Sequence, residues 1–176
     1  MCGSVINRLH NCSNNDELTG LWNRRFFHRR LGEELKRVKK TGDWVSLIYI
    51  DVDNFKRIND TNGHVFGDMV LRRLADILKA NCRGVDTVAR WGGEEFVIIL
   101  PGTDVKGAVA FADRLRRTVE TSDLGFPTTV SIGISTTQAT IDPECFLLKA
   151  DEALYKAKEN KNCVVISEQT LLAKSF

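Results

Sequence analysis

The sequence lacks a long apolar run, and no stretch of its 176 residues approaches the length needed to span a membrane. The N-terminal segment 1–7 (MCGSVIN) also lacks the charged and then apolar pattern of a signal peptide. An excess of one charge is equally absent, because the formal net charge is only +2. Composition therefore gives no reason to expect a nucleic acid or a membrane surface as a partner, and we expect a cytoplasmic chain without a membrane segment.

Paired cysteines are missing as well. The five cysteines include no CxxC pair, and they lie at positions 2, 12, 82, 145 and 163. This odd and scattered set is typical of reduced thiols in a cytosolic protein, and it argues against a disulfide framework or a structural zinc site. The chain is 43% hydrophobic and 27% charged, which is the composition of a soluble globular domain.

The length and pattern predict one globular domain with short tails. Residues 1–15 are polar and end in NCSNN, so we expect a linker or tail there, followed by the domain over 16–168 and a C-terminal tail over 169–176. Hydrophobic periodicity predicts the elements of the domain. The expected helices cover about 24–40, 66–83, 105–119 and 143–158, and the expected strands cover about 44–52, 86–91, 94–100, 129–136 and 163–166.

After the first helix, the predicted order is β-α-β-β-α-β, which is the split-βαβ, ferredoxin-like arrangement. The predicted fold class is therefore α+β, with a central and mostly antiparallel sheet flanked by helices. In this topology the first and third strands are antiparallel neighbours at the centre of the sheet. Asp51, at the end of the first strand, should then lie beside Glu94 and Glu95 at the start of the third.

These carboxylates form the first candidate site. Asp51 and Asp53 share one face of their strand, so they can crowd against Glu94 and Glu95. Carboxylates in a partly dry site repel one another unless they are protonated or bridged by a cation, and all-oxygen ligands favour Mg²⁺ over zinc. A pair of such ions can activate a hydroxyl and clamp a phosphate. The alternative is a solvated acidic edge whose carboxylates cap a turn.

The segment 54–68 (NFKRINDTNGHVFGD) is predicted to be a loop that leads into a helix N-terminus. Helix N-termini bind phosphate through unpaired N–H groups, and Lys56 can neutralise a polyphosphate. Asn59 and Asp68 can read a purine edge, because a carboxylate accepts from the N–H donors that guanine presents. Alternatively, Asp68 caps its helix and His64 is an ordinary hydrogen-bonding loop residue.

Arg83-Gly84-Val85-Asp86, before the second strand, is another candidate site. An Arg and an Asp three residues apart on a loop can hold a phosphate or a guanine face. The alternative is a helix C-terminus in which Gly84 adopts the left-handed conformation and Arg83 interacts with the helix dipole.

Several motifs, taken in order, resemble one family. They are DELTGLWNRR (16–25), DVDNFKRINDTNGHVFGD (51–68), RWGGEEF (90–96), VSIGIS (130–135) and ADEALYKAK (150–158). From about Asp16 to Ile166 the sequence is similar to a GGDEF domain, the catalytic domain of diguanylate cyclases, here with the signature GGEEF. The resemblance implies a fold like those of nucleotide cyclases and polymerase palm domains. It also implies that two GTP molecules are condensed to cyclic di-GMP and two pyrophosphates across a homodimer, each 3′-hydroxyl attacking the α-phosphate of the other GTP.

The resemblance also implies roles for individual residues. Asp51, the backbone carbonyl of Val52 and Glu94 would bind Mg²⁺, as two ions for which Mn²⁺ can substitute. Glu94 or Glu95 would help to deprotonate the 3′-hydroxyl, and the sequence leaves open which of them does so. Lys56 would contact the phosphates, and we expect it to be one of the catalytic residues.

Further positions would hold the nucleotide. Asn59 and Asp68 would bind guanine, His64 would line the site, and Lys158 would contact the phosphates. Gly92-Gly93 would let the nucleotide pack against hairpin backbone where a Cβ would intrude.

Regulation is implied too. Arg83 and Asp86 fall where the family has its inhibitory RxxD site, with Arg114 as an additional expected contact. Cyclic di-GMP should therefore inhibit the enzyme as well as leave it as product. The short N-terminal stub indicates part of a longer signalling protein, so we expect an N-terminal regulatory domain as a further partner.

One segment departs from the family pattern. After YKAK the family usually has two variable residues and then Gly-Arg-Asn, whereas this chain has Glu159-Asn160-Lys161-Asn162-Cys163. Either Lys161 replaces the arginine after a one-residue shortening, or that position is lost as Asn162. The segment keeps open a second function, a catalytically weak domain that binds GTP or cyclic di-GMP as a signalling module. A polymerase palm is a third reading, but the composition offers no basic groove for a nucleic acid.

Overall fold

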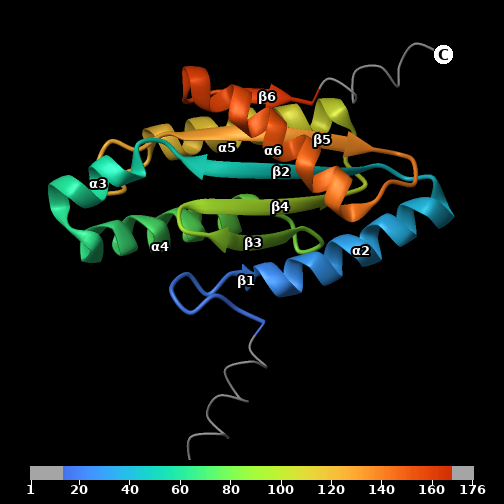
Figure 1. The fold of residues 1–176 in the computed structure, drawn as a ribbon, viewed down its shortest axis with the longest axis horizontal. Helices are drawn as coiled ribbons and strands as arrows, with labels where there is room; N and C mark the ends of the chain where they lie inside the picture. Colours follow the sequence, from blue (N-terminus) through green and yellow to red (C-terminus); the bar gives the residue numbers. More distant parts are fainter. Residues whose placement is uncertain (1–13, 168–176) are drawn as a thin grey trace, which may run out of the picture.

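The computed structural model describes residues 14–167. In this part of the chain a six-stranded sheet is flanked by five helices (Figure 1). The elements, in chain order, are β1 Trp22–Asn23, α2 Arg24–Thr41, β2 Val45–Val52, α3 Phe55–Asn62, α4 His64–Asn81, β3 Thr87–Gly92, β4 Glu95–Pro101, α5 Val105–Thr121, β5 Val130–Thr137, α6 Pro143–Asn160 and β6 Val164–Ile166. None of these described helices is both long and apolar enough to cross a membrane.

The strand order in the sheet is β1-β3-β4-β2-β5-β6. The central strand β2 runs antiparallel to β4 and β5, whereas the outer pairs, β1 with β3 and β5 with β6, are parallel. The expected α+β class and the antiparallel pairing of the first and third predicted strands are confirmed. The register places Asp51 opposite Glu95, as the topology predicted.

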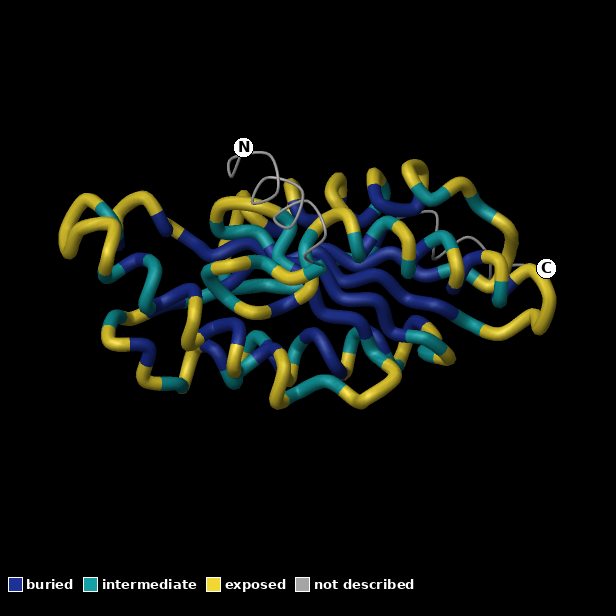
Figure 2. The backbone as a smooth tube through the Cα atoms, turned by 90° about the horizontal axis from the view of Figure 1, so that it is seen from below, coloured by how far each residue is buried: buried dark blue, intermediate teal, exposed yellow. Residues whose placement is uncertain are grey.

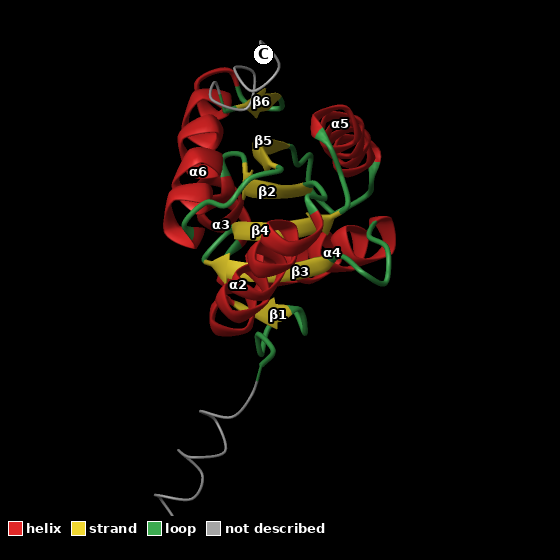
Figure 3. Cartoon of the chain, turned by 90° about the vertical axis from the view of Figure 1, so that its right-hand side faces the viewer, coloured by secondary structure: helices red, strands yellow, loops and turns green. Residues whose placement is uncertain are grey.

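Helices cover both faces of the sheet, with α2 and α6 on one face and α4 and α5 on the other (Figure 3). β2 is buried along its whole length because its side chains alternate between two apolar cores. Ile48 and Ile50 pack with α4 and α5, and Leu47 and Tyr49 pack with α2 and α6. Figure 2 shows the strands as a buried centre surrounded by exposed segments. The same alternation puts Asp51 on the face covered by α6.

Segment 54–68 is helical, so the loop that we predicted there is wrong. Helices α3 and α4 occupy most of it and meet at Gly63, whose φ is 84°. α3 forms because Phe55 and Ile58, three residues apart, give it one buried apolar side. The interpretation of Asp68 as a helix cap is also wrong, because α4 begins four residues earlier.

Other differences concern the ends of elements. β1 was not predicted, because a strand of two residues has no periodicity to detect. α4 ends at Asn81, and Gly84 does not have a positive φ, so the alternative with Gly84 as a left-handed helix cap is wrong. The predicted hairpin is confirmed, but its two turn residues are Gly93 and Glu94, because Gly92 belongs to β3 and pairs with Glu95. The expected tails lie outside the described residues, apart from Asn14-Asn15, which pair beside β1.

Candidate functional site

The structure brings together carboxylates from two strands at one edge of the sheet. Asp51 is only 3% exposed and faces Glu95 across β2 and β4. The Val52 N–H donates to the Glu94 carbonyl, with the nitrogen and oxygen 3.3 Å apart. Because β2 ends where β4 begins, the predicted metal ligands Asp51, Val52 and Glu94 lie side by side with Glu95.

A cation from α6 reaches this edge. Lys158 Nζ lies 2.8 Å from Asp51 Oδ2. Burial lowers the pKa of Lys158, but its bond with Asp51 and the nearby Glu95 outweigh burial and raise the pKa overall. Burial raises the pKa of Asp51, Lys158 opposes that rise, and Glu94 adds to it. The pKa of Glu95 is raised by burial and by Asp51. Lys158 alone therefore does not balance these carboxylates.

Two neighbours behave in ways that the sequence did not reveal. Tyr49, on the same face of β2, donates its hydroxyl to Glu95 Oε2 over a long 3.5 Å. In the sequence Tyr49 is one more member of an apolar run, with no signal of a polar contact. Asp53 was expected to crowd against the other carboxylates, but its oxygens accept from the hydroxyls of Thr129 and Ser131 at 2.7 and 2.6 Å. Asp53 therefore fastens β2 to β5.

The donor set of this edge suits Mg²⁺. Asp51 and Glu94 offer carboxylate oxygens and Val52 a carbonyl oxygen, and Mg²⁺ prefers hard oxygen donors. Within residues 14–167, no three His, Cys, Asp or Glu side chains are arranged to hold a metal by themselves. Phosphate oxygens and water would have to complete the coordination shell, as is usual where Mg²⁺ binds a nucleotide. The uncompensated negative charge favours the binding of a cation there.

The predicted nucleotide contacts lie on the two helices that replace the expected loop. Lys56 and Asn59 belong to α3, and His64 and Asp68 belong to α4, with Lys56 and His64 exposed. Gly67 packs so closely on Asn59 that a Cβ at this position would collide with Asn59 Oδ1. That buried oxygen has no hydrogen-bond partner among the described residues. An unsatisfied acceptor beside Gly67, the residue before Asp68, fits a site whose donors come from a ligand.

The turn between β3 and β4 is open on its outer side. A Cβ added at either residue of Gly92-Gly93 would meet no atom within 4 Å, and the φ of Gly93 is 50°. Arg90 holds the turn, because its Nε and Nη2 donate to the Gly93 carbonyl at 3.1 and 2.8 Å. Arg90 also pairs with Asp16 at 3.1 Å. No pattern in the sequence indicated this pair, because Asp16 and Arg90 are far apart in the chain.

The loop before β3 holds the second predicted site. Arg83 Nη2 donates to Asp86 Oδ1, to the Pro101 carbonyl and to the Thr103 hydroxyl, at 2.8, 3.1 and 3.0 Å. The Asp86 side chain is 1% exposed, and its bond to Arg83 raises the pKa of that guanidinium. Arg114 on α5 lines a hollow of about 240 Å³ together with both residues. The structure therefore brings the three predicted residues together.

The unusual segment 159–163 spans the end of α6. α6 continues to Asn160, and Lys161 and Asn162 both have left-handed backbones, with φ of 56° and 45°. Glycine is the usual residue in that conformation, which favours the alternative in which Lys161 stands at the family's glycine and Asn162 at its arginine. Lys161 Nζ donates to Asn54 Oδ1 at 2.6 Å, whereas the Asn162 amide is bonded to α5.

Comparisons of the sequence with known proteins agree with one another. The family model described as "Diguanylate cyclase, GGDEF domain" matches residues 13–163. Response regulator PleD of Caulobacter vibrioides is 45% identical over 159 residues, which cover 85% of this chain and 35% of the relative. Diguanylate cyclase A of Treponema denticola is 37% identical over 166 residues, with coverage of 89% and 45%. The chain thus spans less than half the length of these two curated relatives.

Solved structures share the fold. The GGDEF domain of DgcB from Caulobacter crescentus, determined in complex with c-di-GMP, has a TM-score of 0.84 at 30% identity, covering 88% of this chain and 93% of that chain. The active GGEEF domain of a diguanylate cyclase from Vibrio cholerae has a TM-score of 0.79 at 34% identity, with coverage of 84% and 97%. Diguanylate cyclase SiaD from Pseudomonas aeruginosa, in complex with its activator SiaC, has a TM-score of 0.83 at 36% identity, with coverage of 93% and 65%.

Proposed function

The chain belongs to the GGDEF family of diguanylate cyclases, and we propose that it condenses two molecules of GTP to cyclic di-GMP and two pyrophosphates. One observation carries the proposal: Asp51, Glu94 and Glu95 meet at a partly buried edge whose negative charge Lys158 does not balance. A relative named as a diguanylate cyclase and a solved GGEEF domain called active support the same activity.

In this proposal Asp51, the Val52 carbonyl and Glu94 hold two Mg²⁺ ions, for which Mn²⁺ can substitute. Ions bound there would activate the 3′-hydroxyl and neutralise charge on the α-phosphate. Lys158 pairs with Asp51 now, and it can turn to the phosphates once that carboxylate has another partner. Lys56, exposed on α3, would contact the phosphates from the other side of the nucleotide.

Glu95 is the better candidate for accepting the proton of the 3′-hydroxyl. Burial and the neighbouring Asp51 raise its pKa, which makes its carboxylate a stronger base than an exposed glutamate. The Tyr49 hydroxyl bonds to one of its oxygens and would help to orient the other. Glu94 would then serve as a metal ligand only.

Nucleotide recognition would divide between guanine and phosphate. Asn59 and Asp68 would bind guanine, since the unsatisfied oxygen of Asn59 lies next to the α4 turn that carries Asp68. His64 would line this site, and the open backbone at Gly92-Gly93 would lie against the nucleotide. Each subunit of a homodimer would hold one GTP, so that each 3′-hydroxyl meets the α-phosphate of the other.

Regulation would come from the product and from partners outside this chain. Arg83, Asp86 and Arg114 would bind cyclic di-GMP, and the similar DgcB domain was solved in complex with that ligand. We also propose a regulatory domain N-terminal to this one as a partner; the curated relatives are much longer than the part that matches, which supports further domains but does not place them.

A second candidate function rests on the segment after α6. It lacks the arginine of the family pattern, and the Asn162 amide is bonded to α5 and so does not replace that arginine as a phosphate contact. If triphosphate binding is weakened enough, the domain would bind GTP or cyclic di-GMP as a signalling module and turn over slowly or not at all.

Incubation of the purified protein with GTP and Mg²⁺, followed by chromatographic separation of the nucleotides, tests the proposal. We expect cyclic di-GMP to form, with two pyrophosphates released for each, and removal of the divalent ion to stop the reaction. Tight binding of GTP with no product from a forced dimer would instead establish the second candidate.

A further inference from the structure

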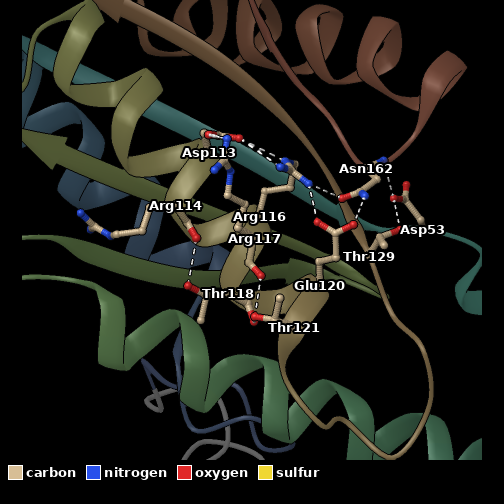
Figure 4. Close-up of polar contacts among 10 residues, drawn as sticks. All are labelled: Asp53, Asp113, Arg114, Arg116, Arg117, Thr118, Glu120, Thr121, Thr129 and Asn162. Atoms are coloured by element: carbon tan, nitrogen blue, oxygen red, sulfur yellow. Dashed lines mark hydrogen bonds and ion pairs between the residues drawn. The ribbon is translucent and has the colours of Figure 1, made fainter.

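A network of polar contacts joins α5 to the end of β2 (Figure 4). At the β2 end, the carboxylate of Asp53 accepts from Thr129, Ser131 and the backbone N–H of Asn162, the last at 2.9 Å. Asp53 is only 5% exposed, so these three donors replace the water that a carboxylate otherwise needs. The end of β2 is thereby tied both to β5 and to the turn after α6.

Asn162 reaches Asp53 from a conformation that non-glycine residues seldom adopt. Its φ is 45°, and that of the preceding Lys161 is 56°. Asparagine tolerates a positive φ better than most residues, but lysine does not, so two such residues in succession persist only where their surroundings hold them. Here the side-chain amide is held at both ends: Asn162 Oδ1 accepts from Arg116 Nη1 at 2.8 Å, and Nδ2 donates to Glu120 Oε1 at 2.8 Å.

Arg116 and Glu120 complete a closed ring with Asn162. They lie one turn apart on α5 and pair with each other at 2.8 Å. The Arg116 side chain is 14% exposed and also bonds to Asp113, which fixes its guanidinium from the other side. Each of the three members of the ring contacts the other two, so α5 sets the orientation of Asn162.

We infer that Asn162 is a positioning residue for the metal site, held in place by Arg116 and Glu120. The Asn162 N–H fixes Asp53, and only Val52 separates Asp53 from Asp51. The ring therefore fixes the strand end that carries the proposed metal ligands. The inference rests on the proposed function, because it needs Asp51 and Val52 to be ligands.

Two readouts separate positioning from a general loss of stability. Hydrogen exchange of the peptide covering residues 50–54, in the protein without metal or nucleotide, reports the order of the strand end. Electron paramagnetic resonance of Mn²⁺, titrated with a GTP analogue whose α,β-bridging oxygen is a methylene, reports metal affinity without turnover. Hydrogen exchange and Mn²⁺ affinity are each compared between variant and unaltered protein at a temperature well below the unfolding transition of every variant.

Asn162→Gly keeps a residue that accepts positive φ but removes both arms of the amide. We expect faster exchange at the strand end and a metal affinity about 10-fold lower, as for the loss of an outer-shell partner. Asn162→Asp should also weaken Mn²⁺ binding, because it faces Glu120 with a second carboxylate. Adding Glu120→Gln to Asn162→Asp exchanges the two roles, because the new amide at position 120 can donate to the new carboxylate at position 162. The double variant has the same net charge as the unaltered protein, and it should restore both hydrogen exchange at the strand end and Mn²⁺ affinity.

A matched pair on α5 serves as the control. Arg116→Ala and Arg117→Ala remove the same charge from neighbouring positions. Arg116 donates to both Asn162 and Glu120, whereas Arg117 pairs with Asp113, has a side chain that is 69% exposed, and affects Glu120 through its charge alone. Only Arg116→Ala should loosen the strand end and weaken Mn²⁺ binding.

Unchanged exchange at residues 50–54 in Asn162→Gly would overturn the inference, whatever the activity. So would a failure of Glu120→Gln to rescue Asn162→Asp, or equal effects of Arg116→Ala and Arg117→Ala. No Mn²⁺ binding by the unaltered protein would overturn the proposed function, and the inference with it, even if the exchange data behaved as expected.

Discussion

Asp51 and Glu95 face each other at the ends of β2 and β4 with Lys158 bonded to Asp51, whereas Arg83 and Asp86 satisfy each other in the loop before β3. At the first site, burial and repulsion from neighbouring carboxylates raise the pKa of Asp51 and of Glu95 despite the lysine. At the second, the carboxylate is more deeply buried but is matched by a guanidinium. A cation would improve the first site, whereas a ligand at the second must replace contacts that already exist.

This difference separates function from stability. A group that is poorly compensated in the free protein is ready for a ligand, so its removal should cost activity and little or no stability. A group whose charge is already matched contributes to the fold, so its removal should cost stability as well as binding. The following substitutions test that contrast.

Glu94→Ala should have the largest effect. It removes a proposed metal ligand at the end of the sheet, and turnover should fall by about 1,000-fold or more. The midpoint of thermal unfolding without metal should not fall, because repulsion with Asp51 is relieved. The rate of cyclic di-GMP production measures turnover, and calorimetry measures the midpoint of unfolding. Turnover within about 10-fold of the unaltered protein would show that Glu94 holds no metal.

Arg83→Ala should weaken product inhibition and lower stability together. The cyclic di-GMP concentration for half-inhibition should rise about 10-fold, and unfolding should cost about 1–3 kcal/mol less, because buried Asp86 loses its partner. Arg114→Ala is the control, since it lines the same hollow without bonding Asp86 and should affect inhibition alone. If cyclic di-GMP inhibits both variants at the same concentration as it inhibits the unaltered protein, the loop has a structural role only.

Glu95→Gln should stabilise the metal-free protein by up to about 1 kcal/mol while it lowers activity. The folded protein raises the pKa of Glu95 through burial and Asp51, so ionised Glu95 opposes folding. Protonation removes that cost, and the advantage of the variant should therefore shrink as pH falls through the raised pKa. Denaturant unfolding of both proteins, repeated from neutral pH to below the raised pKa of Glu95, measures this difference in stability. A variant less stable at neutral pH would mean that Glu95 is well compensated.

Asp16→Asn should change stability by a similar amount without lowering activity, and its effect should depend on pH in the opposite way. Burial would raise the pKa of Asp16, but hydrogen bonds from Thr19 and Arg90 outweigh burial and lower it. The carboxylate therefore stabilises the fold above its unfolded pKa, and that contribution is lost as pH falls through the lowered value. We expect a loss of about 1 kcal/mol at neutral pH that vanishes in acid. A difference that persists in acid would point to packing instead of charge.

The order of elements was enough to predict the sheet centre and the meeting of Asp51 with Glu94 and Glu95. Strand pairing follows from chain order in a split-βαβ fold, so residues far apart in sequence could be placed together. The helix α3 was missed because its polar segment, which ends at Gly63, has only two buried apolar residues, Phe55 and Ile58.

Contacts that depend on side-chain direction could not be predicted. The sequence shows Asn162 only as a departure from a family pattern, and nothing in it indicates that Arg116 and Glu120 hold its amide. That ring depends on two successive left-handed residues after α6 and on where α5 crosses the sheet. The pairing of Arg90 with Asp16 likewise needs the parallel contact of β1 with β3.

Turnover per chain, measured against total protein concentration with GTP and Mg²⁺, tests the central claim most directly. Each chain supplies half of an active site, so the rate of cyclic di-GMP formation per chain should rise with concentration and become independent of it when two chains are fused to a dimerising coiled coil. A fused dimer that binds GTP and forms no cyclic di-GMP would contradict the claim that this edge of the sheet is a cyclase active site.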